Sequence, residues 1–403
     1  MANGPKQYRV GTLAYTRPRL ALLFFWLLWG DFCFNLMENV VPSILPLKLQ
    51  KLGASNVTIG IILSTTPMLL NMILNPVIGF RSDRYRSRWG RRIPFIFVTL
   101  PFLVVCLLGL AFGDQIGAFL REALPILRNH FSSSGVALGV TGIMMILFSI
   151  FNTFVNSVFW YLFNDVVPEH LLARFMAWFR LIGMGAIALY NFFIFKYAGA
   201  YATQIMAGAA ILYLFGFGLM CLNVREGEYP SPPENTDGQI GPIAAIKTYA
   251  RECLALPHYW YIFLASICLG GVMASSAFML FFYQSTGLTL AMIGVVIGVR
   301  SITTGVMVLG AGWLADRFHP IRVVIAGLLL QVLLAMPASL LWLFWRPSPT
   351  TSYWLWLILT IALIAPATAL MTMLDPPLLM RIFPRSRFGQ FCSANALWRS
   401  GSV

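Results

Sequence analysis

The chain has 403 residues, of which 59% are hydrophobic and only 10% are charged. A soluble domain of this length does not need so many apolar side chains, so the composition predicts a polytopic membrane protein. The net charge of +14 comes from Lys and Arg residues in the loops between apolar runs, not from one soluble face. We therefore expect contact with anionic membrane lipids and not with nucleic acid.

Ten apolar runs are long enough to cross about 30 Å of hydrocarbon. They fall at 20–46, 58–80, 93–112, 136–162, 175–197, 201–222, 258–283, 290–314, 323–345 and 353–380. Basic residues precede the first run, as in a signal peptide, but the run is too long and has no cleavage site of small residues. We interpret it as a retained first span.

Alternation of these spans from a cytoplasmic N-terminus places most of the basic residues in the cytoplasm. The opposite side receives only Lys48, Lys51, Arg121, Arg128, Lys196 and Arg346. Because loops rich in Lys and Arg stay in the cytoplasm, the sequence predicts this orientation over its inverse. The membrane we expect is a bacterial inner membrane.

The segment from Arg225 to Gly241 is rich in Pro, Glu, Gly, Asn and Asp, a composition that cannot bury enough surface to fold. It predicts a cytoplasmic linker, 223–256, between an N-terminal membrane bundle, 1–222, and a C-terminal bundle, 257–403. Gly-x-x-x-Asp-Arg at 79–84 recurs at 312–317, so the second bundle repeats the first. We expect an all-α protein of two pseudo-symmetric six-helix bundles.

By this register the chain ends inside an eleventh span, begun by residues 391–398. About two further spans would complete two six-helix bundles, so the C-terminal bundle is expected to be incomplete. The sequence alone leaves two explanations: a fragment of a longer protein, or a departure from the twelve-span pattern.

The loop after the second span, 81–92, contains six arginines, and residues 82–95 follow the pattern Ser-Asp-Arg-x-x-Ser-Arg-x-Gly-Arg-Arg-x-Pro-Phe. Together with Gly79, this pattern resembles the loop after the second helix of major facilitator superfamily carriers. More narrowly, it resembles the glycoside/pentoside/hexuronide:cation symporters and the related sucrose/proton symporters. The resemblance implies two helical bundles, alternating access and a site between the bundles.

In that family the loop glycine allows two helices to approach, and the aspartate joins a charge network that is remade as the carrier changes conformation. The resemblance therefore assigns a conformational switch to Gly79, Asp83, Arg84, Gly90, Arg91 and Arg92, and to their echo at Gly312, Asp316 and Arg317.

Ionisable side chains are rare within the spans, where they cost at least about 2.5 kcal/mol and should face a cavity or a partner. Asp31, Asn35 and Glu38 share one helical face of the first span, with Asp31 about 18 Å from Arg19 along the axis. We predict that Asp31 and Glu38 bind the coupling ion and that Asn35 contacts the solute. The alternatives are a structural hydrogen bond for Asp31 and a solvated position at the mouth for Glu38.

The identity of the coupling ion follows from a departure from the family pattern. The melibiose-carrier branch places cation-binding aspartates in its second span, whereas residues 58–80 contain no acid. This difference favours a proton over sodium.

Two further groups in the second half are candidate solute contacts. Arg300 lies about 17 Å from the outer end of its span, where a guanidinium needs a carboxylate such as Asp31, or solute oxygens. Thr372 and Asp375 share a face of the tenth span. The alternative for Asp375 is that it ends the helix with the two prolines that follow it.

The fourth span carries Asn152, Asn156 and Trp160 at helical spacing. Amides can bind sugar hydroxyls and aromatic faces can pack on sugar rings, so we predict solute contacts for all three. The alternatives are hydrogen bonds between helices for the amides and anchoring at the membrane interface for Trp160.

The sequence has no phosphate-binding loop, dinucleotide fingerprint, metal signature or nucleophile elbow. We predict a monomeric secondary transporter, not an enzyme, without cofactor or metal, that couples a proton to the movement of a sugar or glycoside. One alternative is a carrier or exporter of another small organic solute or drug. The other is a non-transporting protein with the carrier fold, such as a pigment-complex assembly factor or a sensor.

Overall fold

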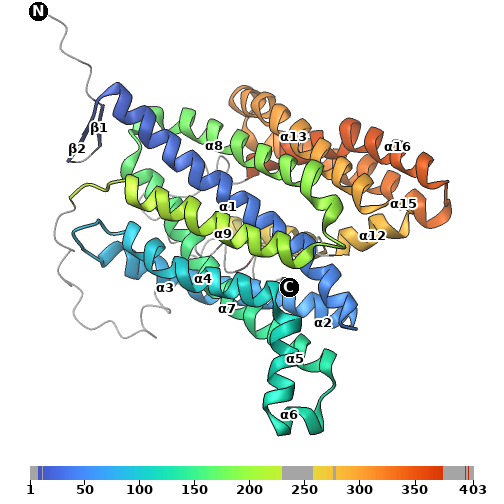
Figure 1. Cartoon of the computed structure of the whole chain (residues 1–403). Helices are drawn as coiled ribbons and strands as arrows, with labels where there is room; N and C mark the ends of the chain where they lie inside the picture. Colours follow the sequence, from blue (N-terminus) through green and yellow to red (C-terminus); the bar gives the residue numbers. More distant parts are fainter. Residues whose placement is uncertain are drawn as a thin grey trace, which may run out of the picture.

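A computed structural model describes residues 8–10, 12–228, 257–275 and 278–374, together with Asn395 and Trp398. This part of the chain is almost entirely helical, with one short antiparallel hairpin near the N-terminus (Figure 1). The elements up to residue 223 are β1 (Tyr8–Val10), β2 (Leu13–Tyr15), α1 (Arg17–Lys51), α2 (Asn56–Gly60), η1 (Ile61–Thr65), α3 (Thr66–Arg84), α4 (Ile93–Ala111), α5 (Gly113–Ala123), α6 (Pro125–His130), α7 (Ser133–Val166), α8 (Glu169–Leu189), η2 (Tyr190–Ile194), η3 (Phe195–Tyr197) and α9 (Ala202–Asn223).

The second half of the chain contains a further set of helices. They are α11 (Pro257–Ser275), α12 (Met279–Ser285), α13 (Leu290–Phe318), α14 (Pro320–Leu330), η5 (Gln331–Ala335), α15 (Met336–Phe344), α16 (Pro349–Leu359), η6 (Thr360–Ile364), α17 (Ala365–Met371) and η7 (Thr372–Leu374). Residues 229–256 lie outside the described ranges, so the linker and the domain division at 223–256 stay predictions.

Nine helices among the described residues are long and apolar enough to cross a membrane. They coincide with nine of the ten predicted spans, which confirms an all-α integral membrane protein. The remaining prediction, 258–283, falls on α11 and α12, where residues 259–268 form a shorter apolar helix. Helix starts follow local sequence: Ser132 caps α7 by accepting from the Gly135 N–H at 3.0 Å, and Ser55 caps α2 by accepting from the Thr58 N–H at 3.1 Å.

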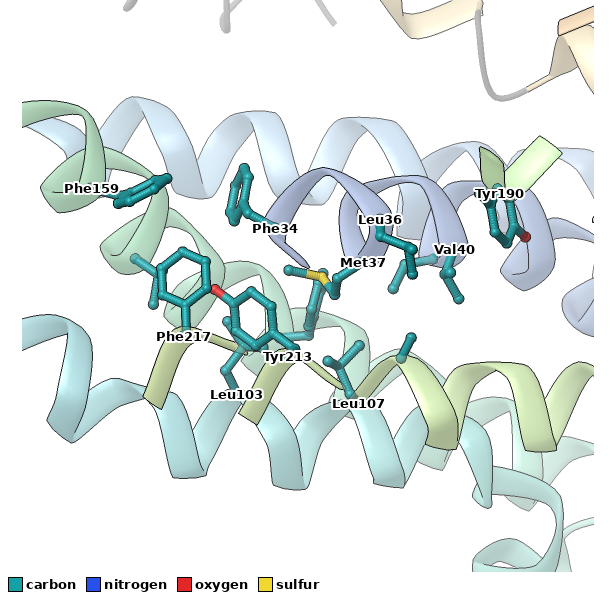
Figure 2. Packing of buried hydrophobic residues seen from close by; sticks show 14 of the residues in the cluster. Phe34, Leu36, Met37, Val40, Leu103, Leu107, Phe159, Tyr190, Tyr213 and Phe217 are labelled. Atoms are coloured by element: carbon teal, nitrogen blue, oxygen red, sulfur yellow. The ribbon is translucent and has the colours of Figure 1, made fainter. Parts of the chain in front are cut away.

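The core of the N-terminal bundle forms where α1 packs against α8 and α9, and where α4 packs against α7 and α9 (Figure 2). Phe34 of α1 meets the stacked pair of Tyr213 and Phe217, whose ring centroids are 4.7 Å apart. Met37 and Leu107 are fully buried beside them. This interior fixes α1 rigidly, and α1 in turn carries the acidic residues singled out in the sequence.

The two halves touch through α13, which packs against α8, η2 and η3. Short π-helical segments interrupt four spans, at η1, η2, η5 and η6. Such segments are frequent at functional sites because they redirect side chains within an otherwise regular helix.

Candidate functional site

A cavity of about 210 Å³ lies in the N-terminal bundle, between α1, η1, α3 and α7. Half of its wall is polar, made by Glu38, Asn71, Ser149, Asn152, Thr153 and Asn156. The apolar half is made by Val41, Pro42, Leu63, Pro67, Met145 and Phe148. A concave site with convergent polar groups and an apolar wall is the usual form of a small-molecule site.

The centre of the polar wall is a hydrogen bond between α7 and α1. Asn152 donates from Nδ2 to Oε1 of Glu38 at 2.5 Å. The other amide atom, Asn152 Oδ1, is buried and has no hydrogen-bond partner in the described part of the chain. Because a buried acceptor without a donor is costly, this oxygen is ready to accept from a hydroxyl of a bound solute.

Backbone chemistry adds to the acceptors near this bond. Pro42 stands four residues after Glu38 inside α1 and has no N–H to donate to the Glu38 carbonyl. That carbonyl therefore lacks its normal helical donor.

Two hydrogen bonds fix α3 against α7 beside the cavity. Thr153 donates to Oδ1 of Asn71, and four residues later Ser157 donates to Oδ1 of Asn75 at 2.6 Å. The equal spacing makes two parallel rungs between the helices. The amides of the second span therefore connect helices, and Asn71 also lines the cavity.

Asp31 lies apart from this cavity. It is fully buried, and Asn35 donates from Nδ2 to both Oδ1 and the backbone carbonyl of Asp31, at 2.6 and 2.9 Å. The Asn35 amide also lies next to Gly183 of α8. Of the two predicted coupling carboxylates, Glu38 is therefore the one placed among candidate solute contacts.

The other predicted solute contacts are dispersed. Trp160 is 41% exposed and packs on Phe163 and Phe179 at centroid distances of 5.9 and 5.2 Å, outside the cavity lining. Thr372 donates to the carbonyl of Ala369 within its own segment, at 2.6 Å. Asp375 lies outside the described residues.

Arg300 is half-buried on α13. Among described residues it makes no hydrogen bond or ion pair, and its charge interacts electrostatically with Tyr283 of α12. The predicted pair between Arg300 and Asp31 is not formed in this structure: Asp31 Oδ1 accepts from Asn35, and Asp31 Oδ2 has no hydrogen-bond partner among the described residues. The pair stays a prediction for another state of the cycle.

A second polar centre lies where the arginine-rich loop meets the end of α7. Arg91 donates to the Asp165 carboxylate from Nε at 3.0 Å and from Nη2 at 2.6 Å, and Arg92 donates to it from Nε at 3.1 Å. Arg92 also donates to Ser82 and lies over the Tyr161 ring. The side chains of Arg92 and Asp165 are only 5% and 11% exposed.

The same loop is held from its other side by Glu226, which follows α9. Its carboxylate accepts from the backbone N–H groups of Arg91, Arg92 and Ile93 at 3.0, 2.8 and 2.6 Å, so it caps the start of α4. Gly90 has φ of 104°, and a Cβ there would approach Glu226 to 2.5 Å. Only glycine fits this turn.

The remaining switch residues are placed less completely. Gly79, Asp83 and Arg84 lie in the last turns of α3, and Gly312, Asp316 and Arg317 lie in the last turns of α13. Arg317 lies 5.4 Å from the ring centroids of Trp313 and Phe318. The assignment of all these residues to a conformational switch stays a prediction.

Sequence reasoning missed Asp165 and Glu226. Each is an acid at the end of a predicted span, which is a weak signal. Their partners are 74 and about 134 residues away in the chain, and nothing local shows which loop they meet.

Two bundles of membrane helices, a polar cavity enclosed by spans and an arginine loop tied to helix ends together define a membrane carrier. The chain belongs to the major facilitator superfamily, whose sequence model matches residues 27–403. It is therefore a transporter and not an enzyme, and the prediction of this superfamily is confirmed. The narrower resemblance to glycoside/pentoside/hexuronide:cation and sucrose/proton symporters stays a prediction.

Solved structures agree with this fold. The inward open xylose transporter XylE from E. coli aligns with a TM-score of 0.63 and 13% identity, covering 95% of this chain and 87% of XylE. A bacterial homologue of the human lysosomal transporter Spinster, inward-facing and unoccupied, gives 0.65 and 15%, covering 96% and 81%. The nucleoside transporter NupG gives 0.61 and 10%, covering 94% and 89%. At these identities the likeness concerns the fold alone.

Proposed function

We propose that this secondary transporter is a proton-coupled symporter of a sugar or glycoside, which binds its solute in the cavity between α1, α3 and α7. The observation that carries the proposal is the Glu38–Asn152 hydrogen bond in the cavity wall, with Asn152 Oδ1 left without a donor. One carboxylate and a free amide acceptor are thus combined in one small site.

The polar groups of the wall suit a solute rich in hydroxyls. Asn152 Oδ1 can accept one hydroxyl proton, and Asn156 offers both an amide donor and an acceptor. The volume of about 210 Å³ is below the range of roughly 300 to 1,000 Å³ typical of drug-sized sites, which favours a small polar solute. Two of the similar solved structures are described as a xylose and a nucleoside transporter, and both solutes carry sugar hydroxyls.

Proton coupling rests on the position of Glu38. An ionised carboxylate within a span is costly, and protonation removes its charge. Protonation would also convert Glu38 from an acceptor into a donor and so change its bond with Asn152. The Asn152 amide would then contact the bound solute and also respond to the protonation of Glu38. Asp31, buried and hydrogen-bonded to Asn35, is the second candidate.

The conformational part of the proposal concerns the contacts of Arg91 and Arg92 with Asp165, and of the start of α4 with Glu226. Asp165 ends α7 and Glu226 follows α9, so both helices are tied to the loop that starts α4. We assign this network the role of stabilising one state of the alternating-access cycle and of opening as the bundles rock.

A thermal-shift screen of the purified protein tests the solute class. The panel contains mono- and disaccharides, glycosides, nucleosides and apolar drugs. A sugar present at 100 times its Kd should stabilise the protein by about 2.7 kcal/mol. Asn156→Ala should abolish the shift, whereas Asn223→Ala, at the exposed end of α9, should retain it. A thermal shift caused only by apolar drugs would contradict the proposal. The absence of a shift with every compound of the panel would contradict it as well.

A further inference from the structure

Between α4 and α7 the chain forms a helical hairpin, α5 and α6, that we name the 113–131 hairpin. In Figure 1 it projects from one end of the N-terminal bundle, roughly across the direction in which α1 and α9 run. Because α4 begins at the arginine-rich loop and ends at the hairpin, the hairpin lies at the opposite membrane surface from that loop. Both of its ends join membrane spans, so these ends lie at that membrane surface.

The contacts of Lys48 at the end of α4 set the direction in which the hairpin leaves the bundle. Lys48 of α1 is buried and donates from Nζ to the carbonyls of Leu110 and Ala111, at 2.8 and 2.9 Å. These are the last carbonyls of α4, which a helix leaves without internal donors. Lys48 Nζ also lies 3.6 Å from Oδ1 of Asp114, in the first turn of α5. The Lys48 ammonium group thus caps the C-terminus of α4 and forms an ion pair with the first turn of α5.

Close packing fixes α5 against α7 as well. A Cβ at Gly117 would come within 2.6 Å of the Ala137 Cα, so glycine is required for this approach. With one side held by α7 and its first turn held by Lys48, α5 has a defined rotation about its axis.

That rotation divides α5 into two chemically different sides. Ile116, Phe119, Leu120 and Ala123 follow one another at i, i+3, i+4 and i+7 and form an apolar face. The opposite side carries Asp114 and Arg121, while Gln115 and Glu122 flank Phe119 at i−4 and i+3. A short helix with a sharp apolar face and a charged face is typical of segments that lie in the membrane interface.

The protein covers this apolar face only in part: Ile116 and Leu120 are half-buried, whereas Phe119 and Ala123 are exposed. Phe119 and Ile126 are 69% and 72% exposed, and Phe131 is 55% exposed. The neighbouring spans present similar residues to lipid, such as Val105 on α4 at 63% and Ile143 on α7 at 57%. The hairpin thus joins two spans that both expose apolar side chains, and Phe112 at the start of α5 is itself 40% exposed.

We propose that the 113–131 hairpin is a lipid-binding element that lies flat in the headgroup region of the bilayer. Phe119 and Ile126 enter the boundary with the acyl chains. Arg128 and the polar side of α5 remain at the level of phosphates and water. The occupant of this surface is thus phospholipid, and the hairpin anchors the end of the bundle opposite the arginine-rich loop.

Nitroxide scanning of the full chain in phospholipid vesicles tests this proposal. Single cysteines are introduced on a cysteine-free background at Phe119 and Ile126, and as matched polar positions on the opposite sides of the two helices at Arg121 and Arg128. Val105→Cys serves as the lipid-exposed reference. Collision rates are measured with oxygen, which concentrates in lipid, and with a water-soluble nickel chelate.

The ratio of oxygen to nickel collisions should exceed one at 119 and 126, as at 105, and fall below one at 121 and 128. Ratios below one at 119 and 126 would place the hairpin in water and overturn the proposal. Protection of 119 and 126 from both reagents would instead indicate a protein contact, such as a second copy of the chain, and would also overturn it.

Discussion

Removal of the Asp165 carboxylate is the perturbation for which the structure gives the clearest magnitude. Asp165 accepts three charge-assisted hydrogen bonds from two arginines, and only 11% of its side chain is exposed. Loss of one partner from a buried ion pair typically costs about 3 to 5 kcal/mol. Arg92 keeps its contacts with Ser82 and Tyr161, and Arg91 is 20% exposed, so solvent and other partners offset part of the loss.

We therefore expect Asp165→Ala to destabilise the protein by about 3 kcal/mol, close to two decades in the folding equilibrium. The assay is the fraction of monodisperse protein that survives heating in detergent, read by size-exclusion chromatography. The matched control is Glu228→Ala, which removes an exposed acid near the same end of the bundle.

A double-mutant cycle with Arg92→Ala separates the ion pair from local packing. The double variant should lose less than the sum of the two single losses, because each single change leaves a charge without this partner. The ion pairs of Asp165 do not stabilise the folded state if Asp165→Ala has the same thermal stability as the Glu228→Ala control. The same conclusion follows if the stability losses of the two single variants simply add in the double variant.

Two further predictions concern topology and the second bundle. Ser87→Cys in the arginine-rich loop should resist an impermeant thiol reagent in intact cells, whereas Asn129→Cys on α6 should react; labelling of position 87 from outside would reverse the topology. Arg300→Ala should reduce transport, and the Arg300→Ala, Asp31→Ala double variant should lose less than the two single losses combined, since the pair is expected to form in another state of the cycle. Independent losses in transport would show that these two residues are not coupled.

The sequence was sufficient for the fold because span length and helical spacing are local properties. In the described part of the chain, nine apolar helices lie where hydropathy places them, and the spacing of Asn152 and Asn156 brings both to one cavity wall. The same spacing put Asp31, Asn35 and Glu38 on one face of α1. Helical spacing could not show that Asn35 on this face lies next to Gly183 of α8, whereas Glu38 lines the cavity.

Contacts between distant segments were beyond sequence reasoning. The ties of Asp165 and Glu226 to the arginine loop depend on how α4, α7 and α9 pack, which no local pattern encodes. The corner made by Lys48 is similar: a lysine near a span end is typical of a solvated position, yet here it is buried on the carbonyls of α4.

The central claim is that Glu38 carries the proton that drives solute uptake. Its most direct test is accumulation of the solute identified by thermal shift, in proteoliposomes with an imposed pH gradient. Wild type should concentrate the solute, and Glu38→Gln should lose accumulation while still exchanging solute across the membrane. Accumulation by Glu38→Gln at the wild-type level would contradict the account, and its loss in Asp31→Asn instead would move the coupling site to Asp31.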